Sequence, residues 1–204
     1  MTAADQSEVA GPSSGPHRRM RRAERRAQIL DAATKAFARS GFAATSLDHI
    51  VTEAGITRVL LYRHFDSKAD MYRAVLERAC ERLVSEVGDD NYDADAIPAL
   101  LRAASADPEG FRLLFHHAAR EPEFRGMIDD LNSASAEVAR RNLAKLIPAG
   151  PWLDWAAQVV PAVTIESVIG WLDAGQPDPD SAADRVAQVV GGVIRAAAPP
   201  AGES

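Results

Sequence analysis

The apolar residues of this chain recur every three or four positions, the spacing that gathers side chains on one face of an α-helix. The pattern begins near Ala23, after which Ile29, Leu30, Ala33 and Phe37 would share a face. No alternation of apolar and polar residues long enough for a half-buried strand is present. We therefore predict an all-α fold.

Two short helices joined by a tight turn are predicted next, after Gly41 ends the first helix. Thr45 or Ser46 can cap the first short helix, since a hydroxyl accepts from free N–H groups at a helix start. Gly55 is expected to form the turn because glycine adopts a positive φ at little cost. Thr57 would cap the second helix, which we expect to end at Phe65. Together they predict a helix-turn-helix, a motif that places its second helix in the DNA major groove.

Further helices are predicted throughout the rest of the chain. Pro108 and Pro151 each fit the first turn of a helix, where the missing N–H removes no intrahelical hydrogen bond. The expected helices span residues 67–87, 95–104, 108–119, 123–146, 152–174 and 180–197.

Charge is divided unevenly along the chain. The net charge of −6 and the pI near 5.4 argue, by themselves, against a nucleic-acid-binding protein. However, residues 17–83 carry a balance of +6, whereas residues 84–204 carry −10. A basic N-terminal third on an acidic body fits a DNA-reading domain attached to a part that does not bind phosphate.

These patterns predict five segments. The first is rich in turn formers and poor in large apolar residues, so we expect it to be disordered. The segments are a tail (1–16), a helix-turn-helix domain (17–68) with an arginine-rich arm (17–26), a connecting helix (69–87), a helical regulatory and dimerisation domain (88–198) and a second tail (199–204).

Several classes of protein are excluded at this stage. A single cysteine, Cys80, cannot form an intrachain disulfide and makes a structural zinc site improbable, so we expect no metal. We expect no apolar run to reach the roughly 18 residues of a membrane span, and the first 16 residues lack the basic-then-apolar order of a signal peptide, which together predict a cytoplasmic protein. No glycine-rich phosphate loop or nucleophile elbow occurs, so we expect neither a cofactor nor an enzyme.

The second short helix carries the candidate DNA contacts. Arg58, near its start, can donate two hydrogen bonds to the O6 and N7 of a guanine; the alternative is an arginine that contacts only phosphate. Tyr62 and His64, one turn later, can donate to phosphate oxygens, and Lys68 can add a charge to the same backbone.

The sequence around this helix resembles a known family. The stretch AGITRVLLYRHFDSKADMYRAVL, from Ala54 to Leu76, is similar to the DNA-binding domain of TetR-family transcriptional regulators, with its Leu-Tyr-x-His-Phe pattern and Ser-Lys pair. The similarity extends back through AATKAFARSGFAATS and covers roughly residues 24–78. Where the family often has a small residue and a threonine before the Leu-Tyr pair, this chain has Val59 and Leu60, so any readout there would be apolar contact.

The resemblance implies a homodimeric, repressor-type protein that binds a palindromic operator and is released by a small molecule held in the C-terminal domain. It also implies phosphate contacts at the start of the first short helix and DNA contacts in and after the second. The residues so assigned are Thr45, Ser46, Thr57, Arg58, Val59, Leu60, Tyr62, His64 and Lys68.

Six arginines lie within nine residues ahead of and at the start of the first helix. They can occupy a narrow minor groove, where the negative potential is deepest, or they can form a solvated tail that adds only non-specific attraction. Both interpretations stay open for Arg18, Arg19, Arg21 and Arg22.

The acidic body must supply dimerisation and, if the resemblance holds, a ligand cavity. The last two predicted helices carry long apolar faces with small residues between them, which predicts a four-helix dimer interface; an intrachain core is the alternative. The candidate pocket residues are Phe111, Leu114, Phe115, His117, Arg120, Phe124, Met127, Trp152, Trp155 and Glu166.

A ligand-responsive dimeric regulator is therefore the leading hypothesis. The alternative is a DNA-binding protein that acts architecturally or through a partner protein, without a small-molecule effector. An enclosed apolar cavity in the body would favour the first, and a filled core the second.

Overall fold

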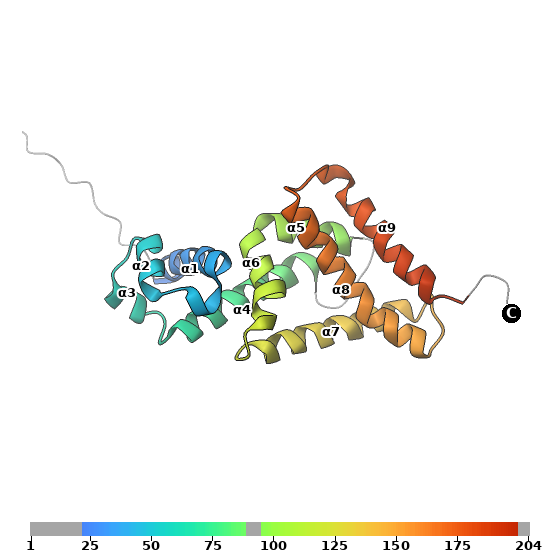
Figure 1. Ribbon diagram of the computed structural model, residues 1–204, viewed down its shortest axis with the longest axis horizontal. Coiled ribbons are helices and arrows are strands. Elements are labelled where there is room, and N and C mark those ends of the chain that lie inside the picture. The colour runs from blue at the N-terminus through green and yellow to red at the C-terminus, as the bar shows by residue number, and fades with distance from the viewer. Residues whose placement is uncertain (1–21, 89–94, 200–204) are drawn as a thin grey trace, which may run out of the picture.

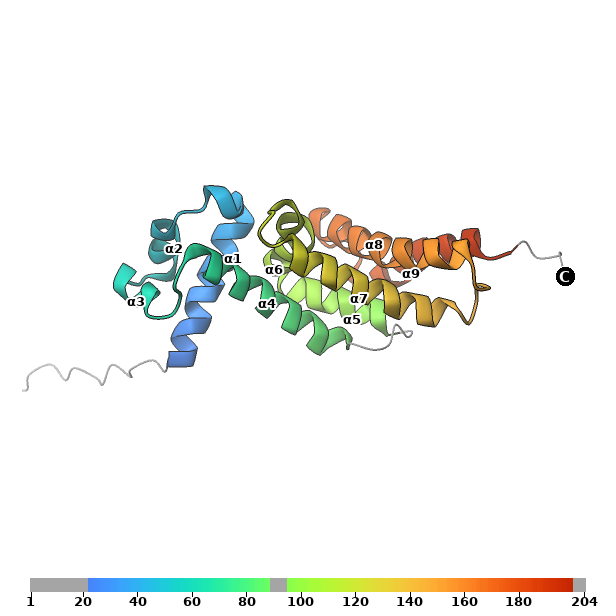
Figure 2. The same ribbon diagram turned by 90° about the horizontal axis from the view of Figure 1, so that it is seen from below.

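The computed structural model describes residues 22–88 and 95–199, and within them it contains nine α-helices and no strand. The prediction of an all-α fold is confirmed. The helices are α1 (Arg22–Ala44), α2 (Leu47–Ala54), α3 (Arg58–Tyr62), α4 (Lys68–Val87), α5 (Ala96–Ala106), α6 (Pro108–Arg112), α7 (Arg125–Leu143), α8 (Pro151–Asp173) and α9 (Pro179–Ala197). Helices α1 to α3 form a small lobe, α5 to α9 form a larger body, and α4 runs from one to the other (Figures 1 and 2).

The helix ends agree closely with the predictions made from local sequence. Gly41 interrupts α1 with φ 75° and ψ 170°, and a short helical stretch follows it. Pro108 and Pro151 occupy the first turns of α6 and α8, as predicted. Helix α3 is shorter than expected and ends at Tyr62, although the next residues continue the turn, with the N–H of Phe65 donating to the carbonyl of Leu61 at 3.1 Å.

A π-helical turn (Leu113–His117) and a 3₁₀ turn (Ala118–Arg120) join α6 to α7. Leu113 and Leu114 of the π-helical turn pack in the same apolar cluster as the small lobe, whereas Phe111 of α6 packs against α5 and α8. This segment therefore contacts both parts of the molecule.

Helix α4 belongs to the core of the small lobe as well as linking it to the body. Met71, Tyr72, Val75 and Leu76 of α4 are buried in the cluster that also contains buried residues of α1, α2 and α3. The predicted boundary between the helix-turn-helix domain (17–68) and the connecting helix (69–87) would therefore divide α4 after its first residue.

Arg78 fastens the middle of α4 to α1. Its side chain is only 15% exposed and donates to Asp31 Oδ1 at 2.7 Å and to Thr34 Oγ1 at 2.9 Å. It also donates to the carbonyl oxygen of Ala27 at 3.4 Å, so one guanidinium binds three acceptors on α1, which its forked geometry permits.

An aromatic cluster connects the two parts of the molecule. The ring centroids of Tyr72 and Phe124 are 4.7 Å apart, and Phe42 lies 5.0 Å from Tyr72 and 5.3 Å from Phe124. Phe42 comes from the end of α1, Tyr72 from α4 and Phe124 from the start of α7. The apolar core is therefore continuous between the small lobe and the body.

Helix α8 contacts both α7 and α9 in the body, and it runs alongside α9 in Figure 1. By length and composition α8 is apolar enough to cross a membrane, so the expectation that no segment meets this test was wrong. A core helix of a water-soluble protein passes the same test, and Val168, Ile169 and Leu172 of α8 are buried against α5 and α6. The observation is weak evidence for a membrane span.

Candidate nucleic-acid interface

The turn between α2 and α3 has the geometry that the sequence predicted. Gly55 adopts φ 62° and ψ 38°, in the left-handed region, and its N–H contacts the carbonyls of Val51 and Thr52. Thr57 is extended, and its hydroxyl accepts from the N–H of Leu60 at 3.3 Å. The glycine reverses the chain and the threonine starts α3, so the two short helices form a helix-turn-helix.

Helix α3 buries one side and exposes the other. Leu61 is fully buried and anchors the helix in the core of the small lobe. Val59 is 66% exposed and Tyr62 49% exposed, and Arg58 lies beside them at the start of the helix. Leu60 is partly buried. An apolar valine and an aromatic ring kept in water on the same short helix are available for contacts with another molecule.

Arg58 has a partner on α2. Its Nη1 lies 3.5 Å from Oδ1 of Asp48, and both side chains are more than half exposed. Asp48 was not among the functional residues predicted from the sequence. Ten residues separate the two, so only the packing of α2 against α3 brings them together.

Thr45 and Ser46 take different roles at the start of α2. The hydroxyl of Ser46 accepts from the N–H of His49 at 3.2 Å, which makes Ser46 the cap. Thr45 is buried, and its hydroxyl donates toward the carbonyl oxygens of Gly41 at 2.6 Å and Ala36 at 3.1 Å. The structure therefore uses the Thr45 hydroxyl inside the small lobe, in contrast to the phosphate contact expected of it.

Lys68 is also engaged within the protein. Its Nζ donates to the carbonyl oxygens of Phe42 at 2.8 Å, Thr45 at 3.1 Å and Ala43 at 3.3 Å. These three bonds use all the donors of an ammonium group. In the free chain Lys68 therefore bonds the start of α4 to the end of α1, and its phosphate contact stays a prediction.

His64 lies next to the arginines at the start of α1. Burial lowers the pKa of His64, and the positive charges of Arg22, Arg26 and Arg25 lower it further. The guanidinium of Arg26 also lies over the Phe65 ring, 5.0 Å from its centroid. The end of α3 and the first turns of α1 therefore share one basic surface. Arg18, Arg19 and Arg21 lie outside the described residues.

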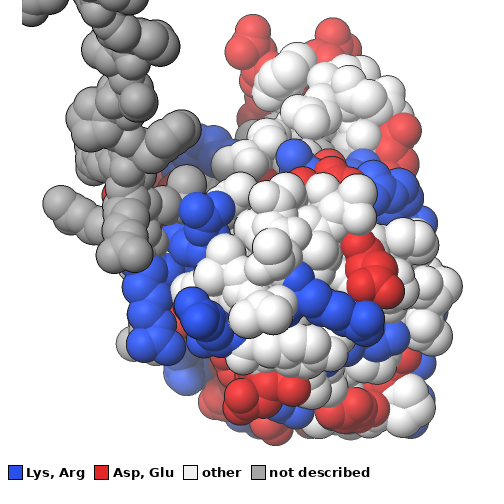
Figure 3. Space-filling model, turned by 90° about the vertical axis from the view of Figure 1, so that its left-hand side faces the viewer, with Lys and Arg blue, Asp and Glu red and all other residues white. Residues whose placement is uncertain are grey.

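The face of the small lobe that carries α2 and α3 combines these features (Figure 3). Lys and Arg side chains border an uncharged centre in this view, and acidic side chains gather mainly at its lower and right-hand edges. An uncharged centre with basic groups around it matches the division between base contacts and phosphate contacts in DNA readers.

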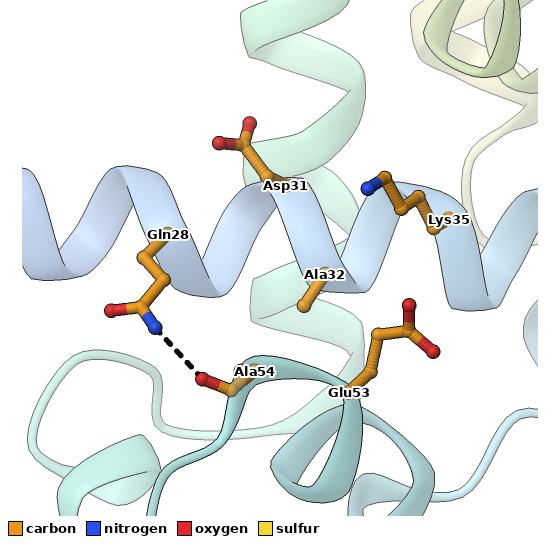
Figure 4. A pocket seen from close by; sticks show the side chains of 6 residues that line it. All are labelled: Gln28, Asp31, Ala32, Lys35, Glu53 and Ala54. Carbon is orange, nitrogen blue, oxygen red and sulfur yellow. Dashed lines mark hydrogen bonds between the residues drawn. The ribbon is translucent and has the colours of Figure 1, made fainter.

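An open hollow lies beside this face, between α1 and α2, and it shows how the turn is held (Figure 4). Within it, Nε2 of Gln28 donates to the carbonyl oxygen of Ala54 at 2.8 Å, and Oε1 of Gln28 accepts from Arg25 at 2.7 Å. The last residue of α2 is thus bound to α1 directly ahead of the Gly55 turn. Gln28 could not be predicted from local sequence because its partner is 26 positions away.

The predicted pocket residues of the body are distributed between two apolar clusters and the protein surface. Phe111 and Phe115 contact each other, with ring centroids 4.8 Å apart. Leu114 and Phe124 are buried in the core shared with the small lobe, and Met127 packs against the same core. His117 is partly buried, and burial together with the charge of Arg120 lowers its pKa.

The remaining candidates lie on the surface of the body. Trp152 is 62% exposed, and its ring centroid is 5.7 Å from that of Trp155 at the start of α8. Glu166 is exposed and lies 3.3 Å from Nε2 of His116. Both tryptophans and Glu166 are therefore exposed on α8, whereas Phe111 is buried, and a pocket that they share stays a prediction.

Within residues 22–88 and 95–199, no group of three or more His, Cys, Asp or Glu side chains is arranged to hold a metal ion. His116 has Glu166 as its neighbour.

Comparison with known proteins agrees with this geometry. Residues 29–75 match the family described as bacterial regulatory proteins, tetR family. The chain is 30% identical over 203 residues to the HTH-type transcriptional activator FasR of Mycolicibacterium smegmatis, and the similarity covers 89% of each chain.

Two solved structures share the fold. A TetR-like transcriptional regulator from Rhodococcus sp. RHA1 superimposes with a TM-score of 0.74 at 23% identity, covering 85% of this chain and 97% of that one. The transcriptional regulator FadR of Bacillus subtilis, solved in complex with stearoyl-CoA, has a TM-score of 0.62 at 18% identity, covering 82% and 97%.

Proposed function

Since this chain belongs to the tetR family of bacterial regulatory proteins, we propose that it is a ligand-responsive transcriptional regulator that binds an inverted-repeat operator as a homodimer. Its relatives are transcriptional regulators, a role that requires no catalysis. Access to DNA places its action in the bacterial cytoplasm.

The observation that carries this proposal is the exposed side of α3. This side carries the exposed residues Arg58, Val59 and Tyr62, whereas Leu61 on the opposite side is buried in the core. A rigid helix with its first turn exposed is what major-groove reading requires. His64 and Arg22 would then contact the flanking phosphates, and Thr57 and Ser46 would hold the ends of the two short helices toward the DNA.

The apolar surface of α8 and α9 supports a dimer. Helix α8 is apolar, yet only 33% of its most apolar 18-residue window is buried within the chain. Val189 of α9 is 46% exposed, and Gly191 and Gly192 allow another helix to approach closely. Two such helix pairs would bury these faces in a four-helix bundle across a two-fold axis. Two copies of α3 about 34 to 36 Å apart would then reach successive major grooves.

Small-molecule control is supported by the continuity of the core and by the family. A ligand that changes the packing of the body can act on α3 through the aromatic cluster of Phe42, Tyr72 and Phe124, without touching DNA. FadR, which has the same fold, binds stearoyl-CoA. FasR, which is similar to this chain along 89% of both chains, is named an activator. The sequence led us to expect repression, so whether this chain activates or represses transcription has to be measured.

The function is tested by selecting binding sites for the purified chain from a pool of randomised duplexes. We expect an inverted repeat, bound by two chains, and a clear preference for it over random duplex in a mobility-shift assay. Replacement of Arg58 by Ala should weaken binding to the selected repeat much more than binding to random duplex. Recovery of no common sequence, or of a single unrepeated half-site, would contradict the proposal. Transcription in vitro from a promoter carrying the repeat gives the sign of regulation.

A further inference from the structure

We propose that Asp48 of α2 is a positioning residue that holds Arg58 for base reading and reduces its use as a general phosphate contact. This inference rests on the proposed DNA-reading role of α3. It starts from the ion pair between Nη1 of Arg58 and Oδ1 of Asp48, which are 3.5 Å apart.

The contribution of this ion pair to the stability of the fold does not explain it well. Both side chains are more than half exposed, and exposed ion pairs of this kind contribute little to the free energy of unfolding. Asp48 is not needed as a helix cap, because Ser46 already accepts the N–H of His49. A carboxylate on this face also repels DNA phosphates, which is a cost for a DNA-binding protein.

The geometry of the guanidinium group explains how Asp48 can assist base recognition by Arg58. An arginine carries five N–H donors in a planar fork, whereas recognition of a guanine uses two of them. Arg58 can therefore keep its contact with Asp48 through Nη1 while other N–H groups donate to O6 and N7. An arginine without such a partner samples many rotamers, and most of them are equally suited to any phosphate nearby.

Asp48 thus acts on specificity in two ways. First, it restricts the rotamers of Arg58 before DNA binds, so less side-chain entropy is lost when Arg58 contacts a base. Second, its negative charge offsets the positive charge of Arg58, which attracts DNA of any sequence. Specificity improves when the right partner is favoured and wrong partners are penalised together. Asp48 lies in the first turn of α2, and the Gly55 turn at the other end of this helix sets how α2 lies relative to α3.

The test compares Asp48→Asn and Asp48→Ala with Glu53→Gln in the full-length chain. Glu53 is the matched control because it lies on the same helix, is ion-paired to Arg39 at 3.1 Å, and its replacement changes the charge by the same amount. Each variant is measured against the inverted repeat selected by the wild-type chain and against a random duplex of equal length. Thermal unfolding verifies that each variant is folded.

We expect both Asp48 variants to bind random duplex more tightly and to lose about fivefold to tenfold in the ratio of specific to random affinity. Glu53→Gln should leave that ratio within about twofold of wild type. In an Arg58→Ala background, Asp48→Asn should no longer change the ratio, because the residue acts through Arg58.

Two results would overturn the inference. One is an equal gain in affinity for both duplexes, which would mean that Asp48 only repels phosphate. The other is a loss of discrimination by Asp48→Asn that persists in the absence of Arg58. Failure of the proposed function is distinguishable, because the wild-type chain itself would then show no preference for the selected repeat.

Discussion

The ammonium group of Lys68 donates to the carbonyl oxygen of Phe42 at 2.8 Å and at the same time lies over the Phe42 ring, 4.5 Å from its centroid. Carbonyl groups at a helix end lack intrahelical partners and carry partial negative charge, so a cation there is favourable. Lys68 therefore joins the first residue of α4 to the end of α1, immediately before the DNA-reading helices.

Replacement of Lys68 by Met should destabilise the chain by about 2 kcal/mol, since it removes charge-assisted bonds to three carbonyls while keeping an apolar stem. Denaturant unfolding measures this loss, and Lys35→Met, at an exposed position of α1, serves as the control. The salt dependence of DNA binding should stay at the wild-type slope. A slope reduced by about one would instead show that Lys68 contacts a phosphate.

Replacement of Arg78 by Lys should cost about 1 to 3 kcal/mol, because an ammonium cannot bind Asp31 and Thr34 in the same forked geometry. Arg82→Lys on the same helix is the matched control, since Arg82 is half exposed and bonds to Asp107 at 2.7 Å. We expect it to cost less than about 1 kcal/mol. Equal losses in the two variants would refute a special role of Arg78 in fastening α4 to α1.

The hydroxyl of Tyr72 is fully buried and has no hydrogen-bond partner among the described residues. Burial, followed by the nearby charge of Glu121, raises its pKa. Tyr72→Phe should therefore stabilise the chain by about 1 kcal/mol, because it removes an unsatisfied polar group and keeps the ring that contacts Phe42 and Phe124. A decrease in the unfolding midpoint would show that the hydroxyl is satisfied in solution.

DNA affinity should rise as the pH falls from about 7.5 to 6 if His64 contacts a phosphate. In the free protein the pKa of His64 lies below its ordinary value of 6.5, so the ring is neutral at pH 7. A phosphate beside it favours the protonated form and raises that pKa, so binding takes up a proton. Calorimetry in buffers of different ionisation enthalpy measures this uptake. His64→Gln should abolish it, whereas His116→Gln in the body should not.

Replacement of Val189 by Glu should convert the proposed dimer to a monomer, because a charge would be buried at the face of α9 that we assign to the interface. Light scattering after gel filtration measures the mass. Val84→Glu, at an exposed valine of α4, is the control and should leave the mass of the assembly unchanged. A dimer that survives Val189→Glu would place the interface elsewhere.

The sequence by itself determined the parts of this molecule that depend on neighbours along the chain. Gly55 reverses the chain because its own backbone tolerates a positive φ, and Ser46 and Thr57 cap helices through N–H groups three residues away. Helical spacing of apolar residues likewise predicted the nine helices to within a few residues at most ends. Such features are recoverable from sequence because the interactions that cause them are local.

The packing of the helices, by contrast, sets which side chains are exposed, which lie in the core and which contact each other. Lys68 and Thr45 have the chemistry of phosphate ligands, but they lie where α1 ends and α4 begins, so carbonyls take their donors. Trp152 and Trp155 are large aromatic residues of the kind that line ligand pockets, but both are exposed at the start of α8. A hydrogen-bond donor binds the acceptor nearest in space, and the distance between segments far apart in the chain is set by the packing of the whole molecule.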